Sequence, residues 1–178
     1  RQRQMCIRDR HIIMEISQTN DQDYMRLALA EARLAEEAGE VPIGAVVVCN
    51  GEVIARAHNT RETDRNPAGH AEFSALLAAA KALDAWRLSD CTVYVTLEPC
   101  IMCAGLMHQA RIARCVYGAA DPKAGALGSL YEIHRDTRLN HTFAVEAGVL
   151  EDECASILKA FFAAKRAQNK PKKKEICS

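Results

Sequence analysis

The sequence predicts an α/β fold in three layers, with helices on both faces of a mixed five-stranded sheet. Apolar runs typical of strands alternate along the chain with longer segments that have the apolar spacing of helices. With 178 residues and no internal repeat, the chain is long enough to bury the core of a single domain. Helices that begin beyond the same ends of neighbouring strands would then share one site, as in other α/β proteins.

The first regular element is expected to be a helix that begins at Asp21 or Asp23 and runs to about Ala38. Aspartate is a good N-cap residue, the apolar residues that follow share one helix face, and Gly39 can end the helix. Residues 1–20 carry four arginines and show no sustained periodicity. We interpret them as an N-terminal extension that need not be ordered or native.

The next two elements are expected to form a β-hairpin. Residues 44–49 are an unbroken apolar run, Asn50-Gly51 is a strong turn signal, and residues 53–57 alternate as a return strand would. The polar segment 59–69 contains Pro and Gly and predicts a loop. A second helix is expected over residues 71–85, directly after this loop.

The rest of the domain is expected to add three strands and two helices. The helix nearest the C-terminus has a strong amphipathic stripe. The expected strands are 92–97, 114–118 and 143–147, and the expected helices are 99–111 and 150–167. These elements define one domain over residues 21–168.

The composition restricts the partners and the compartment. Lys+Arg and Asp+Glu are equal at 23 each, so no overall charge favours nucleic acid or a membrane surface. Of eight cysteines, four stand singly in or beside apolar segments, which is typical of reduced core thiols rather than a disulfide framework. Since no apolar run approaches the ~20 residues of a membrane span and no export signal is evident, we expect a soluble, cytoplasmic protein.

The charge is uneven near the C-terminus. From Lys159 to Lys174 the chain has seven basic residues and no acidic one. This segment, which includes a basic tail over residues 169–178, could bind phosphates with an affinity that depends on salt. A merely solvated tail would have the same composition.

Two cysteines at the expected strand-to-helix turn indicate a metal site. Cys100 and Cys103 follow Pro99, a residue that suits the first turn of a helix. On that turn both sulfurs would lie on one face, where unpaired N–H groups favour thiolate over thiol. Two thiolates can hold a zinc ion but cannot complete its tetrahedral coordination.

His70 supplies a third ligand, and Glu72 lies beside it. His70 precedes Cys100 by 30 residues and opens the second expected helix. Three protein ligands leave one position for water, as in catalytic zinc sites, and Glu72 can act as the general base. The pattern His-x-Glu followed by Pro-Cys-x-x-Cys is the known signature of zinc-dependent nucleobase deaminases. Such enzymes add water to an amidine carbon of the base and release ammonia.

Each motif alone has a simpler interpretation. A Cys-x-x-Cys pair is often a structural zinc knuckle or a redox pair, and a lone histidine is more often a capping or core residue than a ligand. A structural zinc with His58 or His108 as its fourth ligand would also use the three residues. The combined pattern favours the catalytic site, because a structural zinc has no need of Glu72.

The two motifs resemble the cytidine deaminase superfamily. The residues that carry the resemblance are His70-Ala71-Glu72 and Leu97-Glu98-Pro99-Cys100-Ile101-Met102-Cys103-Ala104-Gly105. A further segment narrows it to the TadA-like branch, the bacterial tRNA-specific adenosine deaminases; it reads Ala119-Ala120-Asp121-Pro122-Lys123-Ala124-Gly125-Ala126-Leu127-Gly128-Ser129-Leu130. The resemblance covers roughly residues 24–166 and implies a cytidine deaminase-like fold.

The resemblance also implies a function. Members of this branch convert adenosine to inosine at the wobble position of tRNA anticodons, as homodimers with one zinc ion per subunit. By resemblance, the zinc ligands are His70, Cys100 and Cys103, and the proton shuttle is Glu72.

The substrate contacts implied by the resemblance lie outside the metal motifs. Asn59 corresponds to an asparagine that hydrogen-bonds the flipped base. Asp121 and Lys123 lie in the loop implicated in holding the anticodon strand. A folded anticodon loop presents unstacked bases, so extruding one of them costs less than in a duplex.

Two other functions remain open. The first is deamination of a free nucleobase or nucleotide such as guanine, cytosine or dCMP, which could use the same zinc site. The loop after residue 118 and the basic tail favour RNA over these substrates. The second is a zinc-stabilised RNA-binding subunit without activity, in which Glu72 would have no role.

Overall fold

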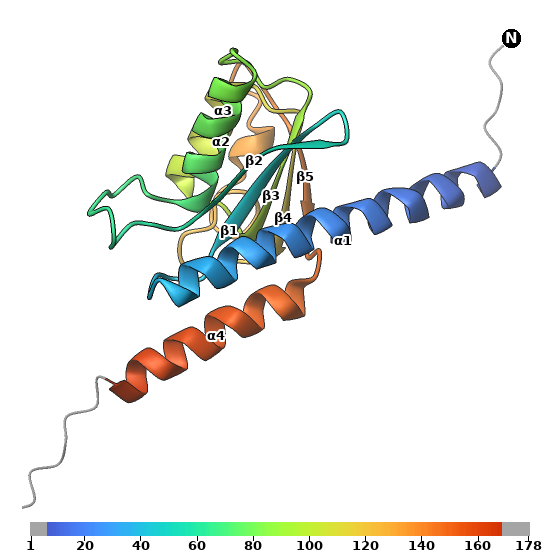
Figure 1. Ribbon diagram of the computed structural model, residues 1–178. Helices are drawn as coiled ribbons and strands as arrows, with labels where there is room; N and C mark the ends of the chain where they lie inside the picture. Colours follow the sequence, from blue (N-terminus) through green and yellow to red (C-terminus); the bar gives the residue numbers. More distant parts are fainter. Residues whose placement is uncertain (1–6, 169–178) are drawn as a thin grey trace, which may run out of the picture.

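The computed structural model describes residues 7–168, with side chains from residue 21 onward. Four α-helices and a short 3-10 helix accompany the strands in this part of the chain (Figure 1). The strands are β1 (Gly44–Cys49), β2 (Glu52–His58), β3 (Cys91–Leu97), β4 (Arg114–Ala119) and β5 (Ala144–Ala147). The helices are α1 (Ile7–Glu37), α2 (Ala71–Ala82), α3 (Ile101–Ala110), η1 (Ile133–Arg135) and α4 (Glu151–Gln168).

The five strands form one mixed sheet in the order β2-β1-β3-β4-β5. The β1–β2 hairpin and the β1–β3 pair are antiparallel, whereas β3, β4 and β5 run parallel. Because β3 and β4 are parallel and Leu97 pairs with Ala119, both strands end at the same edge of the sheet. The segments that follow the two strands are therefore neighbours, and Cys100 forms an isolated bridge with Gly125.

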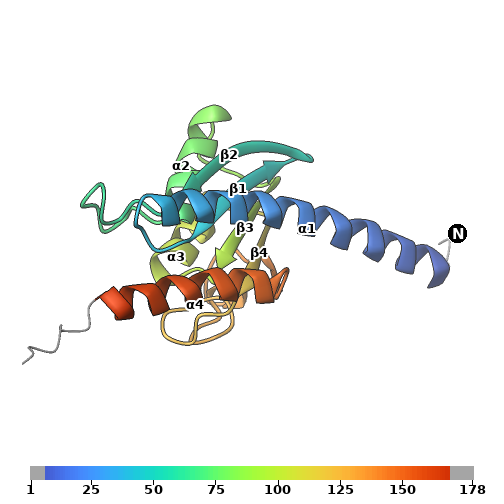
Figure 2. The same cartoon turned by 60° about the horizontal axis from the view of Figure 1, so that its bottom comes forward.

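Helices cover both faces of the sheet, so the predicted three-layer fold is confirmed. Figures 1 and 2 show α2 and α3 on one face and α1 and α4 on the other. One buried apolar cluster joins α2 and α3 to the sheet, and a second joins α1 and α4 to the opposite face. Leu76 and Met107 belong to the first cluster, Met25 and Cys154 to the second.

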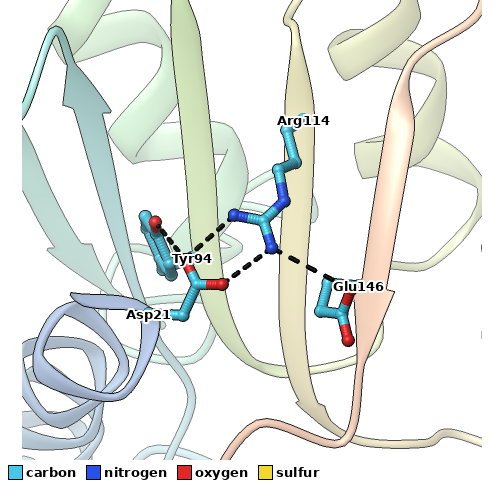
Figure 3. A network of polar contacts seen from close by, with 4 residues as sticks. All are labelled: Asp21, Tyr94, Arg114 and Glu146. Carbon is cyan, nitrogen blue, oxygen red and sulfur yellow. Dashed lines mark hydrogen bonds and ion pairs between the residues drawn. The ribbon is translucent and has the colours of Figure 1, made fainter. Parts of the chain in front are cut away.

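The position of α1 on the sheet depends on two close contacts. A Cβ atom built on Gly44 would lie 2.0 Å from the carbonyl oxygen of Ala28, so the absence of a side chain lets β1 approach the helix backbone. Asp21 adds a buried polar contact (Figure 3): its carboxylate accepts hydrogen bonds from both terminal nitrogens of Arg114 at 2.9 and 2.7 Å, and one from the hydroxyl of Tyr94 at 2.7 Å.

The prediction that α1 begins at Asp21 or Asp23 was wrong. The helix begins at Ile7, and Asp21 lies within it, where its carboxylate binds Arg114 instead of capping a helix end. The sequence does not reveal this role, because Arg114 is 93 residues away. The interpretation of residues 1–20 as an extension stays a prediction. Residues 1–6 and the basic tail 169–178 lie outside the described residues.

Other predicted boundaries differ by a few residues. The helix expected from residue 99 begins at Ile101, so Cys100 is its N-cap and Pro99 lies outside the helix. The second helix ends at Ala82 rather than near residue 85. The 3-10 helix η1 was not predicted, since no apolar pattern marks three residues.

Candidate metal centre and its surroundings

The two helix starts bring three potential metal ligands together. His70 is the N-cap residue of α2, Cys100 is the N-cap residue of α3, and Cys103 lies in the first turn of α3. Nδ1 of His70 lies 3.6 Å from each of the two sulfur atoms. All three ligand atoms lie within 4.8 Å of one another, and no other group of this kind occurs in the part of the chain with described side chains.

The donor set and its spacing fit a zinc ion. With Zn–S distances of ~2.3 Å and Zn–N distances of ~2.0–2.1 Å, tetrahedral angles separate a sulfur from a nitrogen ligand by ~3.6 Å. The observed separations between Nδ1 and the two sulfurs have this value. One imidazole and two thiolates are typical zinc ligands and leave a tetrahedral site one position short.

The three candidate ligands shift one another's pKa values. A hydrogen bond from the thiol of Cys103 lowers the pKa of Cys100 to about 4. That same bond, followed by burial, raises the pKa of Cys103. The hydrogen bond with Cys100 also raises the pKa of His70. The lowered pKa favours the thiolate form of Cys100, which is the form that binds a cation.

Glu72 is a buried carboxyl group in the first turn of α2. Glu72 is 4% exposed and follows the helix N-cap residue, the candidate ligand His70, in the first turn. Burial raises the pKa of Glu72 to about 7. A carboxyl group with this pKa can both accept and donate a proton near neutral pH.

Asn59 directly follows β2 and is held by another buried carboxylate. Nδ2 of Asn59 donates a hydrogen bond to Glu40 at 3.2 Å, and the backbone N–H of Thr63 donates to the same carboxylate at 2.6 Å. Asn59 is 5% exposed and Glu40 is 1% exposed. Sequence reasoning missed Glu40, because its partners are 19 and 23 residues away and no local pattern marks it as buried.

Asp121 and Lys123 lie in the segment between β4 and η1, residues 120–132, which we call the β4–η1 loop. Oδ1 of Asp121 accepts hydrogen bonds from the backbone N–H groups of Lys123 at 2.9 Å and Ala124 at 3.2 Å, so it stabilises the loop itself. The side chain of Lys123 is exposed. Both residues line an open cavity of about 520 Å³ together with residues of α4; its lining consists of Val41, Leu97, Asp121, Lys123, Leu158, Lys159, Phe162 and Arg166.

Neither histidine considered as a fourth ligand belongs to the cluster. Nδ1 of His58 pairs with the carboxylate of Glu31 at 3.0 Å, and the ring of His108 lies 6.0 Å from the ring of His141. The structural-zinc alternative therefore lacks a fourth histidine or cysteine within the residues described from position 21 to 168. Glu72, in contrast, lies in the first turn of α2, two residues after the candidate ligand His70.

Known proteins are similar to most of this chain. Residues 19–166 match the family model of the MafB19-like deaminases. The chain is 51% identical over 158 residues to a tRNA-specific adenosine deaminase of Bacillus subtilis strain 168. The aligned region covers 89% of this chain and 98% of that protein.

Solved structures are similar as well. One comes from a study of A-to-I editing by tRNA:A34 deaminases at the wobble position of transfer RNA. It is 46% identical to this chain and superposes with a TM-score of 0.74, and the match covers 76% of this chain and 99% of that chain. A structure of guanine deaminase from Nitrosomonas europaea has a TM-score of 0.68 and 27% identity, with 80% and 84% of the two chains covered.

Proposed function

Because the chain belongs to the MafB19-like deaminases, and within them to the tRNA-specific adenosine deaminases, we propose that it converts adenosine to inosine at the wobble position of tRNA anticodons. The observation that carries this proposal is the arrangement of the site. Three ligand atoms suited to zinc meet at two helix starts, next to a buried carboxyl group with a pKa of about 7.

We propose that His70, Cys100 and Cys103 hold one zinc ion in each chain. When bound, the ion acts as a Lewis acid that lowers the pKa of a water molecule toward neutrality. Two sulfurs and one imidazole leave a coordination position for that water, which explains why a fourth protein ligand is unnecessary.

Glu72 is the proton carrier in this proposal. Its carboxylate takes a proton from the water that adds to C6 of the adenine ring. It delivers that proton to N1 of the ring, then takes the proton of the new C6 hydroxyl group and passes it to the departing amine, so that adenosine and water become inosine and ammonia. Burial supports this role, because it raises the pKa of Glu72 to about 7 and lets one group perform both transfers at neutral pH.

The proposed substrate contacts come from the segment after β2, which begins with Asn59, and from the β4–η1 loop. Asn59 hydrogen-bonds the flipped base, and its fixed position next to Glu40 supports that role. In the cavity beside α4, three cations outnumber the one carboxylate, as expected for a surface that binds the phosphates of an anticodon strand. The cations are Lys123, Lys159 and Arg166, and the carboxylate is Asp121.

We also propose that the chain forms a homodimer through the outer face of α2 and α3. An apolar cavity of about 220 Å³ lies there, lined in part by Leu77, Trp86 and Leu106. Leu77 is 55% exposed and Trp86 is 60% exposed, and exposed apolar patches of this kind are typical of protein interfaces. Sedimentation of the purified protein, with Trp86→Glu as a variant expected to dissociate it, tests this assembly.

A tRNA substrate implies that the protein acts in the cytoplasm. None of the helices within residues 7–168 has the length and apolar character that a membrane span requires.

The main alternative to a tRNA substrate is a free base, which the likeness to a guanine deaminase at 27% identity keeps relevant. The higher identity to tRNA-specific relatives favours RNA as the substrate.

The test compares four substrates with one protein preparation. Zinc-loaded protein is incubated with an anticodon stem-loop that has adenosine at the wobble position, and with free adenosine, cytidine and guanine, while ammonia and inosine are measured. The control RNA has guanosine at the wobble position. We expect inosine from the first RNA alone. Turnover of a free base without turnover of the RNA would contradict the proposal.

A variant of the proton carrier completes the test. We expect Glu72→Ala to keep its zinc and its fold while the deamination rate falls by at least ~10²-fold, the usual contribution of general acid–base catalysis. Full activity of this variant would remove Glu72 from the mechanism.

A further inference from the structure

Another buried carboxylate, Glu98, connects the candidate metal centre to the β4–η1 loop. Glu98 is 2% exposed and lies two residues before Cys100. Its oxygens accept hydrogen bonds from the backbone N–H groups of Asp121 at 3.0 Å, Leu127 at 3.1 Å and Ser129 at 3.0 Å. The hydroxyl of Ser129 donates a fourth. One side chain thus binds three separate points of a loop that has little regular structure.

The backbone makes the same connection independently. The N–H group of Ala126 donates to the carbonyl oxygen of Pro99 at 2.9 Å, and Gly125 forms an isolated bridge with Cys100. Gly125 also packs directly on the carboxylate, since a Cβ atom at this position would lie 2.3 Å from Cδ of Glu98. The loop therefore closes over the carboxyl group and meets the turn that carries a metal ligand.

We propose that Glu98 is a positioning residue for the reaction: its carboxylate fixes the β4–η1 loop, with Asp121 and Lys123, against the turn that carries Cys100. The inference rests on the proposed function, in which this loop holds the anticodon strand. Glu98 does not belong to the cluster of candidate metal ligands. It fixes where the RNA-binding loop lies relative to the reacting base.

Four hydrogen bonds to one buried carboxylate make the loop depend on this residue. Replacing Glu98 by alanine leaves three backbone N–H groups, that of Leu127 buried, without their acceptor and opens a cavity under the loop. Replacing it by glutamine keeps the shape, but one of the two oxygens becomes an NH₂ group that faces donors. The two substitutions should therefore act in the same direction, with a smaller effect for glutamine.

Kinetics and proteolysis test the proposal together. For Glu98→Ala we expect KM for the anticodon stem-loop to rise by at least ~10-fold, the effect of losing hydrogen bonds to a charged group, with a smaller change in kcat and unchanged zinc per chain. Trypsin should cleave the Lys123–Ala124 bond faster than in the wild type, because the protease requires a locally unfolded segment. Glu98→Gln should give intermediate values for both.

Two further variants complete the test. The first displaces the carboxylate by another route, and the second controls for general loss of stability. Gly125→Ala, whose added methyl group displaces the carboxylate, should reproduce both effects and keeps the test decisive if Glu98→Ala fails to fold. Tyr94→Phe removes a buried hydrogen bond between β3 and Asp21 of α1 and should leave KM and cleavage at Lys123 unchanged.

Two results would overturn the proposal. The first is a wild-type KM and wild-type cleavage at Lys123 in all three site variants. The second is loss of zinc with a lower kcat and unchanged cleavage, which would make Glu98 a support of Cys100 alone. A wild-type protein that deaminates no stem-loop would refute the proposed function instead. The two failures can be distinguished, because cleavage at Lys123 reports whether Glu98 holds the loop even when the protein has no activity.

Discussion

Removing the carboxylate of Asp21 should destabilise the whole domain without affecting the metal centre. Asp21 lies within α1, and its partners Tyr94 and Arg114 belong to β3 and β4 (Figure 3). The substitution Asp21→Ala leaves a guanidinium group and a hydroxyl group without their partner. Arg114 begins β4, whereas the metal centre lies beyond the other end of the strand, so zinc content should not change.

The size of the effect follows from the exposure of the two charges. Breaking a fully buried ion pair costs about 3–5 kcal/mol, because the remaining charge stays desolvated. The Asp21 side chain is 7% exposed but that of Arg114 is 28% exposed, so water can solvate part of the guanidinium group. Glu146, at 4.0 Å and 56% exposed, compensates little. We therefore expect the free energy of unfolding to fall by about 2–3 kcal/mol.

Urea unfolding of four proteins measures this value. The set consists of the wild type, Asp21→Ala, Arg114→Ala and the double variant. Since both single variants lose the same interaction, we expect the double variant to be more stable than the sum of their effects predicts, by at least ~1 kcal/mol. Additive effects, or a cost below ~0.5 kcal/mol for Asp21→Ala, would show that the contact does not anchor α1.

Three further predictions follow from the structure. Burial and, to a smaller extent, the hydrogen bond to Asp21 raise the pKa of Tyr94. The Tyr94 hydroxyl therefore keeps its proton to a higher pH in the folded state than in the unfolded state. The free energy of unfolding is unaffected below pH ~10 and falls above it by up to ~1.4 kcal/mol per pH unit. Urea titrations should show a weaker dependence for Tyr94→Phe, and equal slopes would contradict the shift. Gly44→Ala should lower the free energy of unfolding by at least ~2 kcal/mol, because its Cβ atom meets the α1 backbone at Ala28, whereas Gly105→Ala, with no atom within 4 Å, should not. Removal of zinc by a chelator should lower Tm reversibly, since zinc at ~1,000 times its Kd stabilises the folded state by about 4 kcal/mol; an unchanged Tm would argue against a metal at His70.

The strands were the most predictable part of the fold. β1 was predicted at its observed bounds, and the other strands to within two residues, because apolar runs between turn signals mark them. The helix ends were less predictable. Pro99 suits a first helical position, but the chain uses Cys100 as the N-cap and starts α3 at Ile101. Local preferences allow several starts, and the contacts of the folded chain select one of them.

The sequence alone determined which residues can bind a metal and carry a proton. Cys-x-x-Cys and His-x-Glu are local patterns whose chemistry depends on residue type and spacing, so His70, Cys100, Cys103 and Glu72 could be predicted as site residues without coordinates. The tertiary structure decided what surrounds them. The contacts of the buried carboxylates Glu40, Glu98 and Asp21 have no local sequence signature, since their partners lie between 19 and 93 residues away and meet them only in the folded chain.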